Sequence, residues 1–259
     1  MKPKTHKIAP SAYLAESEYR SMVSALHVLS TVVAVELHRV AESDRVRVLV
    51  IRNFIARAQV SLESILRLYH DQAYGDCWAL FRTLVDRVFY LHMLDQKDEF
   101  AEFERWSFVK QYETNNNVWS DTSLAAEQKT GVPKPSAKHK ARYKKLKNEG
   151  VAWREPKPED AAKSLDMMFL YKFGYDVASR FLHPLATDGA IEFEYVAQVG
   201  AKGGRCDQRV RLHDACLVVT LLLSLAVNAA RRQWRSFLFD AVEDVRKALT
   251  GKRFRTWHQ

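Results

Sequence analysis

The chain has 259 residues, 47% of them hydrophobic, which is enough to bury a core in one large domain or two small ones. Lys and Arg number 40 against 31 Asp and Glu, and the formal net charge of +9 favours a polyanionic partner such as RNA. The three cysteines, Cys77, Cys206 and Cys216, show no CxxC spacing. This pattern argues against a disulfide framework and a cysteine zinc site, and it indicates a reducing cytoplasm.

No segment predicts membrane insertion. The N-terminus has early lysines but lacks the apolar stretch of a signal peptide. Residues 215–230 are uncharged, but these sixteen residues are fewer than the roughly 20 that cross a bilayer. We therefore expect residues 215–230 to form a buried core helix, the protein to contact no membrane, and its location to be cytoplasmic.

Apolar residues recur at helical spacing along most of the chain. The helices predicted in this way cover residues 13–41, 45–69, 76–94, 99–112, 158–184, 213–239 and 241–249. The first helix carries apolar side chains on more than one face, including Val32, Val33 and Val35. A helix that buries two faces needs a second partner, so we expect a homodimer through this helix and the next.

A basic loop is predicted at about residues 114–157, with a short charged helix inside it. Its Lys and Arg side chains, with Tyr143 and Trp153 nearby, suit the backbone of a nucleic acid. The predicted nucleic-acid-binding residues are Lys138, Lys140, Arg142, Lys144, Lys145 and Lys147.

The apolar period changes from helical to alternating after Asp188-Gly189. Residues 191–199 and 205–212 both alternate, and the glycine-rich residues 200–204 separate them. This pattern predicts a β-hairpin at about residues 190–212. The fold prediction is therefore an all-α multi-helix bundle with one inserted β-hairpin, built as a single domain over residues 1–259.

The densest group of chemically useful side chains is YKFGYDVASRFLHP, residues 171–184. In a helix, Tyr171, Tyr175, Ser179 and His183 follow one another at i,i+4 steps and form one row, which Arg180 flanks. Pro184 places His183 at the helix C-terminus, where the partial negative charge favours the imidazolium form. A proton-donating or phosphate-binding histidine is the chemistry that this arrangement suits.

Arg82 and Asp86 form an i,i+4 pair on the third predicted helix. Taken alone, the pair is typical of a solvated helix face. Together with Tyr175, Ser179, His183 and Pro184, however, it resembles a broad family of bacterial helical proteins known only as a domain of unknown function. The resemblance covers about residues 61–187, with Asp86 where that family more often has Glu. It implies that Arg82 and Asp86 face the Tyr-Ser-His row across a helix contact.

A looser resemblance is to the HEPN group of helical proteins, many of which are metal-independent ribonucleases that use an Arg and a His separated by four to six residues. The chain has this spacing at Arg20/His27, Arg87/His92 and Arg253/His258, and three such matches in a basic chain carry little weight. Only Arg20 is followed by the polar residue that is usual there, and the Arg180/His183 spacing is too short. The resemblance therefore concerns helical architecture alone.

Signatures of other chemistries are missing from the sequence. It contains no GxGxxG, GxxxxGK[ST], HExxH or GxSxG motif, and no His/Glu pair at helical metal-binding spacing. We therefore expect no cofactor and no metal site.

Two functional hypotheses remain open, and the sequence does not decide whether the protein is an enzyme. In the first, the protein is a ribonuclease or other phosphodiester-handling protein that acts on nucleic acid. His183 would act as general acid and base, and the predicted catalytic residues are His183, Arg82, Asp86, Tyr175, Ser179 and Arg180. In the second, the same residues form a structural polar network in a non-catalytic interaction or regulatory protein. Exposure of His183 to solvent separates the two.

Overall fold

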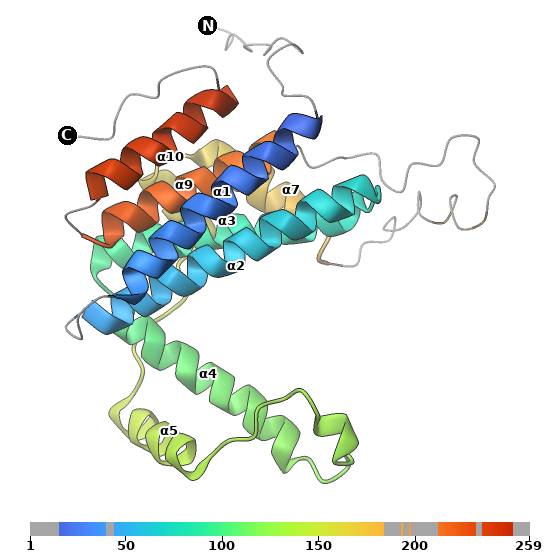
Figure 1. The fold of residues 1–259 in the computed structure, drawn as a ribbon. Helices are drawn as coiled ribbons and strands as arrows, with labels where there is room; N and C mark the ends of the chain where they lie inside the picture. Colours follow the sequence, from blue (N-terminus) through green and yellow to red (C-terminus); the bar gives the residue numbers. More distant parts are fainter. Residues whose placement is uncertain are drawn as a thin grey trace, which may run out of the picture. The chain divides into compact units, whose positions relative to one another are not determined.

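The computed structural model describes residues 16–39, 44–183, 212–231 and 235–250, together with Phe193 and Ala197 (Figure 1). Its α-helices are α1 (Glu16–His38), α2 (Arg45–His70), α3 (Tyr74–Lys97), α4 (Phe100–Ser120), α5 (Ala137–Glu149), α6 (Pro158–Ser164), α7 (Val177–Ser179), α9 (Leu212–Ala229) and α10 (Arg235–Thr250). A 3-10 helix, η3 (Glu127–Lys129), precedes α5, and a π-helix, η4 (Leu170–Asp176), leads directly into α7.

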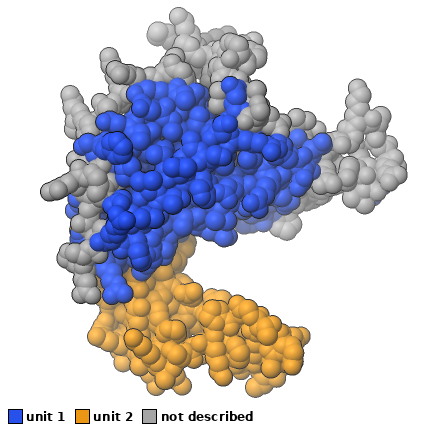
Figure 2. All heavy atoms as spheres, viewed as in Figure 1, with its two compact units in different colours: residues 1–93, 156–259 blue, residues 94–155 orange. Residues whose placement is uncertain are grey.

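The chain folds as two compact units, and the boundary between them falls within α3 (Figure 2). The first unit comprises residues 1–93 and 156–259, and the second comprises residues 94–155. The prediction of a single domain over residues 1–259 stays a prediction.

In the first unit, α1, α2, α9 and α10 pack against one another (Figure 1). The apolar residues of α9 explain its central place, because α9 buries side chains that include Val219, Leu222 and Leu223. Each fully buried aliphatic side chain contributes about 1.5–3 kcal/mol relative to an exposed one. By length and composition, α9 and the Glu18–His38 part of α1 could each cross a membrane, and α9 is mostly buried within the fold. The cytoplasmic location stays a prediction.

In the second unit, α4 and α5 pack through aromatic contacts and one buried leucine. The rings of Tyr112 and Tyr143 stack at 4.3 Å between centroids, and Leu146 is buried beside them. Trp153 packs its buried ring against Phe103 and Trp106, at 4.9 and 4.7 Å. The range expected to be a basic loop thus contains the end of α4, η3 and α5.

The all-α class is confirmed, but the inserted β-hairpin is wrong. The part of the chain that the structure describes contains no strand. Within residues 190–212, Phe193, Ala197 and Leu212 are described, and all three are helical; the rest of that range lies outside the described residues. Alternation over a few residues is a weak signal, because it is compatible with an exposed helix as well as with a half-buried strand.

Two of the predicted helices are interrupted at residues with positive φ. The helix expected over residues 158–184 ends at Ser164, because Asp166 adopts a φ of 54°. The Met167 N–H donates to the Ala162 carbonyl and the Asp166 N–H to the Lys163 carbonyl, which is the hydrogen-bond pattern of a Schellman C-cap. The helix expected over residues 213–239 likewise ends at Ala229, just before Arg231 at a φ of 51°.

Candidate functional site

The candidate site is built on η4 and α7, which lie against α3 within the first unit. Gly174 of η4 is buried, and a Cβ atom placed on it would lie 3.0 Å from a methyl group of Val85 on α3 and 3.0 Å from one of Leu170. The absence of a side chain at position 174 therefore allows the π-helix to approach α3 closely. The π-helical winding also breaks the single i,i+4 row that the sequence predicted for residues 171–183.

Arg82 and Tyr175 make the central polar contact between α3 and η4. The Arg82 Nη2 donates a 2.6 Å hydrogen bond to the Tyr175 hydroxyl, and the guanidinium carbon lies 4.3 Å from the centre of the same ring. Both side chains are half-buried, and the buried Arg82 Nε has no hydrogen-bond partner among the residues that the structure describes. A charged donor and a cation–π contact on one ring together make this a strong tertiary interaction.

Ser179 and Tyr171 surround this contact on the same segment. The Ser179 hydroxyl donates to the Tyr175 carbonyl at 2.7 Å, so it serves the helix backbone. The Tyr171 ring stacks on Tyr175 with centroids 5.8 Å apart. Desolvation, aided by the Asp176 carboxylate, raises the pKa of Tyr171, so its phenol remains protonated at neutral pH.

Asp86 lies one turn after Arg82 on α3 and is half-buried. Its carboxylate acts electrostatically on the neighbouring Arg87. Burial lowers the pKa of Arg87, the charge of Arg57 acts in the same direction, and Asp86 opposes both. Asp86 therefore favours the charged form of a half-buried arginine in α3.

His183 and Arg180 lie on the solvent side of the segment. The last helical residue is Ser179, and the N–H groups of residues 180–182 bond to carbonyls three residues earlier, which makes a tight turn. His183 lies in this turn beyond the helix end, and both side chains are exposed, whereas Pro184 lies outside the described residues. Within the described residues, no hydrogen bond or ion pair joins His183 to Arg82. The structure thus brings Arg82, Tyr175 and Ser179 together, whereas Arg180 and His183 are exposed and contact neither Arg82 nor Tyr175 within the described residues.

Sequence reasoning missed an exposed aromatic pair on the same segment. Phe169 and Phe173 are 69% and 55% exposed, and their rings lie 4.7 Å apart. Between them in sequence stands Lys172, whose side chain is also exposed. The sequence does carry a signal for this pair, because two phenylalanines at i,i+4 spacing lie on one face of a helix, here beside a lysine.

Two arginine–histidine pairs at HEPN-like spacing have other partners in the fold. His27 pairs with Glu63, and Arg20 contacts His70. His92 of the second pair contacts the Ser164 hydroxyl at 3.0 Å. The third pair, Arg253/His258, lies outside the described residues.

The six predicted nucleic-acid-binding residues, all on α5, divide into three groups. Arg142 pairs with Glu104, and Lys147 pairs with Glu113 at 2.6 Å, so both help to hold α5 on α4. Lys145 lies 3.8 Å from Glu149 of its own helix. Lys138, Lys140 and Lys144 are exposed and make no ion pair with another described residue. These three lysines are the ones that remain available to a polyanion.

Comparisons with known proteins place most of these elements in one family. Residues 48–191 match the model described as a family of unknown function, DUF5677. This range includes α3, η4 and α7 and extends into both units. No curated protein matches the chain, and no solved structure matches it.

The close approach at Gly174 generates a prediction with an internal control. We expect Gly174→Ala to lower the free energy of unfolding by about 1–3 kcal/mol, because its methyl group would crowd Val85 and Leu170. Gly75→Ala is the matched control, because its new methyl would lie 3.7 Å from Phe181, an ordinary contact distance. Urea unfolding of both variants measures the difference. Equal stabilities for the two variants would contradict the close approach.

Proposed function

The chain belongs to the DUF5677 family, whose function is unknown, and we propose that it is a metal-independent, HEPN-like phosphodiester-handling protein that acts on RNA. Its proposed site is the exposed side of residues 169–183. The observation that supports this most is the meeting of chemically matched groups on one short segment. The aromatic pair Phe169–Phe173 can stack on bases, and the exposed Lys172 and Arg180 can contact phosphates.

His183 supplies the proposed acid–base chemistry because it is exposed beside these groups. In the proposed reaction, His183 accepts the proton of a ribose 2′-hydroxyl while that oxygen attacks the adjacent phosphorus. The bond from phosphorus to the 5′-oxygen breaks, the leaving oxygen takes a proton from water, and His183 returns its proton to the hydroxide that remains. Arg180 stabilises the charge that develops on the phosphoryl oxygens. The products are a 2′,3′-cyclic phosphate and a 5′-hydroxyl.

Arg82, Asp86, Tyr175 and Ser179 have a positioning role in this proposal. Arg82 is held by Tyr175, and Ser179 is held by the backbone, so neither needs to touch the substrate. The contact between Arg82 and Tyr175 fixes the π-helix on α3, and it thereby sets the direction in which the exposed groups point. The free lysines Lys138, Lys140 and Lys144 of α5 offer a further, sequence-independent contact with an RNA backbone.

A non-catalytic interaction protein is the second candidate function, and one observation favours it. The Arg82 guanidinium is committed to Tyr175 by a hydrogen bond and a ring contact, as in a network that only specifies helix docking. In that case the exposed aromatic pair would bind another protein, and the purified protein would cleave no RNA.

Replacement of His183 separates these candidates. We expect the protein to cleave single-stranded RNA in the presence of EDTA and to leave the matching DNA intact, because DNA lacks the 2′-hydroxyl. We expect His183→Ala to abolish cleavage and to change the free energy of unfolding by less than about 0.5 kcal/mol, as for other exposed positions. His70→Ala, which replaces an exposed histidine at the end of α2, should retain activity. An inactive wild-type protein that also binds no RNA would support the second candidate.

Binding measurements test the aromatic pair independently of cleavage. We expect Phe169→Ala and Phe173→Ala each to weaken binding of single-stranded RNA by about 1–3 kcal/mol, the usual contribution of one stacked base. Phe237→Ala is the control, because Phe237 on α10 is 75% exposed and belongs to no proposed site. Fluorescence anisotropy with a labelled oligonucleotide measures all three variants. An equal loss of affinity for Phe237→Ala would refute a specific stacking role.

A further inference from the structure

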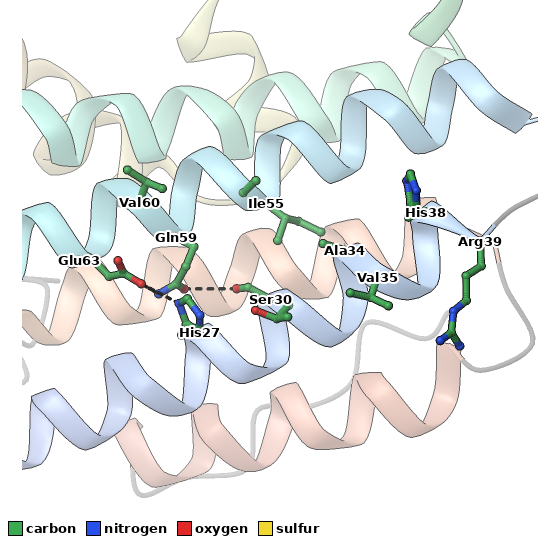
Figure 3. Close-up of a pocket in the computed structure, with 12 residues that line it drawn as sticks. His27, Ser30, Ala34, Val35, His38, Arg39, Ile55, Gln59, Val60 and Glu63 are labelled. Carbon is green, nitrogen blue, oxygen red and sulfur yellow. Dashed lines mark hydrogen bonds and ion pairs between the residues drawn. The ribbon is translucent and has the colours of Figure 1, made fainter.

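A groove of about 420 Å³ lies between α1 and α2 in the first unit (Figure 3). Apolar side chains make up its middle, namely Ala34 and Val35 of α1 and Ile55, Ala56 and Val60 of α2. The two helices run antiparallel, so each end of the groove contains residues from both (Figure 3). An apolar groove between two helices suits an apolar helix face as its occupant.

The surface beside the groove carries exposed apolar side chains. Val28, Val32 and Val35 of α1 and Val60 of α2 are 60%, 40%, 45% and 51% exposed. Of an apolar stretch of 18 residues within the Glu18–His38 part of α1, only 28% is buried inside the fold. A contiguous exposed apolar face on a folded unit typically marks an interaction surface.

One end of the groove carries the Glu63 carboxylate, which is bound by a chain of polar side chains and forms an ion pair with His27. The Ser30 hydroxyl donates to the Gln59 side-chain oxygen at 3.3 Å, and the Gln59 amide donates to Glu63 at 3.0 Å. His27 contacts the same Glu63 oxygen at 2.7 Å (Figure 3). The hydrogen bond from Gln59, with contributions from His27, lowers the pKa of Glu63, so this carboxylate is charged at neutral pH.

The other end of the groove carries basic side chains. His38 and Arg39 lie there (Figure 3), and Arg52 contacts His38 at 2.8 Å. Arg39 pairs with Glu36 and is still 71% exposed in its side chain. From His27 to Arg39 the helix rises roughly 18 Å, so opposite charges stand at the two ends of one apolar strip.

This polarity identifies the partner that fits. A two-fold axis through the middle of the groove exchanges its ends, so the acidic end of one copy meets the basic end of the other. A lipid bilayer fits poorly, because insertion of this face would desolvate Glu63, Arg39 and the polar chain between Ser30 and Gln59.

We propose that the α1/α2 groove binds the same groove of a second copy of this chain in an antiparallel, two-fold arrangement. Val35 and Val60 of each copy pack against the other copy, and Glu63 faces Arg39 of the partner subunit. The proposal does not depend on the proposed activity toward RNA, because it uses other residues and another face.

Light scattering on the size-exclusion column tests the apolar part. We expect about 60 kDa for the wild-type protein at micromolar concentration, twice the chain mass of 29.9 kDa. We expect Val35→Glu combined with Val60→Glu to give the mass of one chain with an unchanged circular dichroism spectrum. Phe237→Glu, at an apolar residue on α10 that is 75% exposed, should leave the dimer intact. A wild-type mass of about 30 kDa would overturn the proposal, as would a dimer that survives both valine replacements.

A charge exchange tests the orientation. Glu63→Arg alone and Arg39→Glu alone each place like charges opposite one another twice per dimer, so each should weaken self-association by about tenfold or more. Mixing the two variants restores both pairs. The arginine introduced at position 63 of one copy faces the glutamate introduced at position 39 of the other, and the unchanged Arg39 faces the unchanged Glu63. We expect heterodimers in the mixture at the wild-type affinity. A mixture no tighter than its components would overturn the antiparallel arrangement, and so would binding of the wild-type protein to lipid vesicles through this face.

Discussion

The contact between Arg82 and Tyr175 sets the geometry on which the candidate site depends. It joins α3 to a π-helix at the place where Gly174 allows the two backbones to approach. A guanidinium that is hydrogen-bonded and stacked on one ring has little freedom, so it fixes the rotation of the π-helix about its own axis. Trp78 and Phe181, stacked with centroids 5.7 Å apart, anchor the turn that follows α7. Because both ends of the segment are held, its outer side chains have defined positions.

The same segment therefore has two chemically different sides. Its inner side buries Gly174 and Ala178 and satisfies its polar groups within the fold, whereas its outer side presents aromatic, cationic and imidazole groups to solvent. An exposed histidine alone is a weak indication of catalysis, but here a rigid helix end positions it beside groups that suit bases and phosphates. The groove between α1 and α2 lies on other helices, so the proposed assembly and the proposed RNA chemistry can be separated by mutation.

Sequence periodicity was sufficient to predict most of the helices and to single out both partners of the central contact. It did not predict the places where a single residue changes the backbone conformation. The apolar spacing predicted α2, α3 and α9 because each buries one continuous face. Arg82 and Tyr175 were both singled out because they stand in helical rows of polar residues. The break at Asp166 was missed because helices more often end at glycine, and the π-helix was missed because its extra residue per turn leaves no periodic signal. Charge counting likewise could not tell Lys140, which is exposed and pairs with no described residue, from Lys147, which pairs with Glu113 of α4.

A double-mutant cycle on the central contact tests this account most directly. Arg82→Gln removes the charge, Tyr175→Phe removes the accepting hydroxyl, and the double variant removes both. Urea unfolding of the four proteins gives the coupling free energy, which we expect to be about 1–3 kcal/mol for a charged hydrogen bond in a half-buried site. The coupling should be accompanied by loss of RNA affinity in both single variants, since the exposed side would no longer be held in place. A coupling near zero, with the two stability losses simply adding, would contradict the central role of this contact.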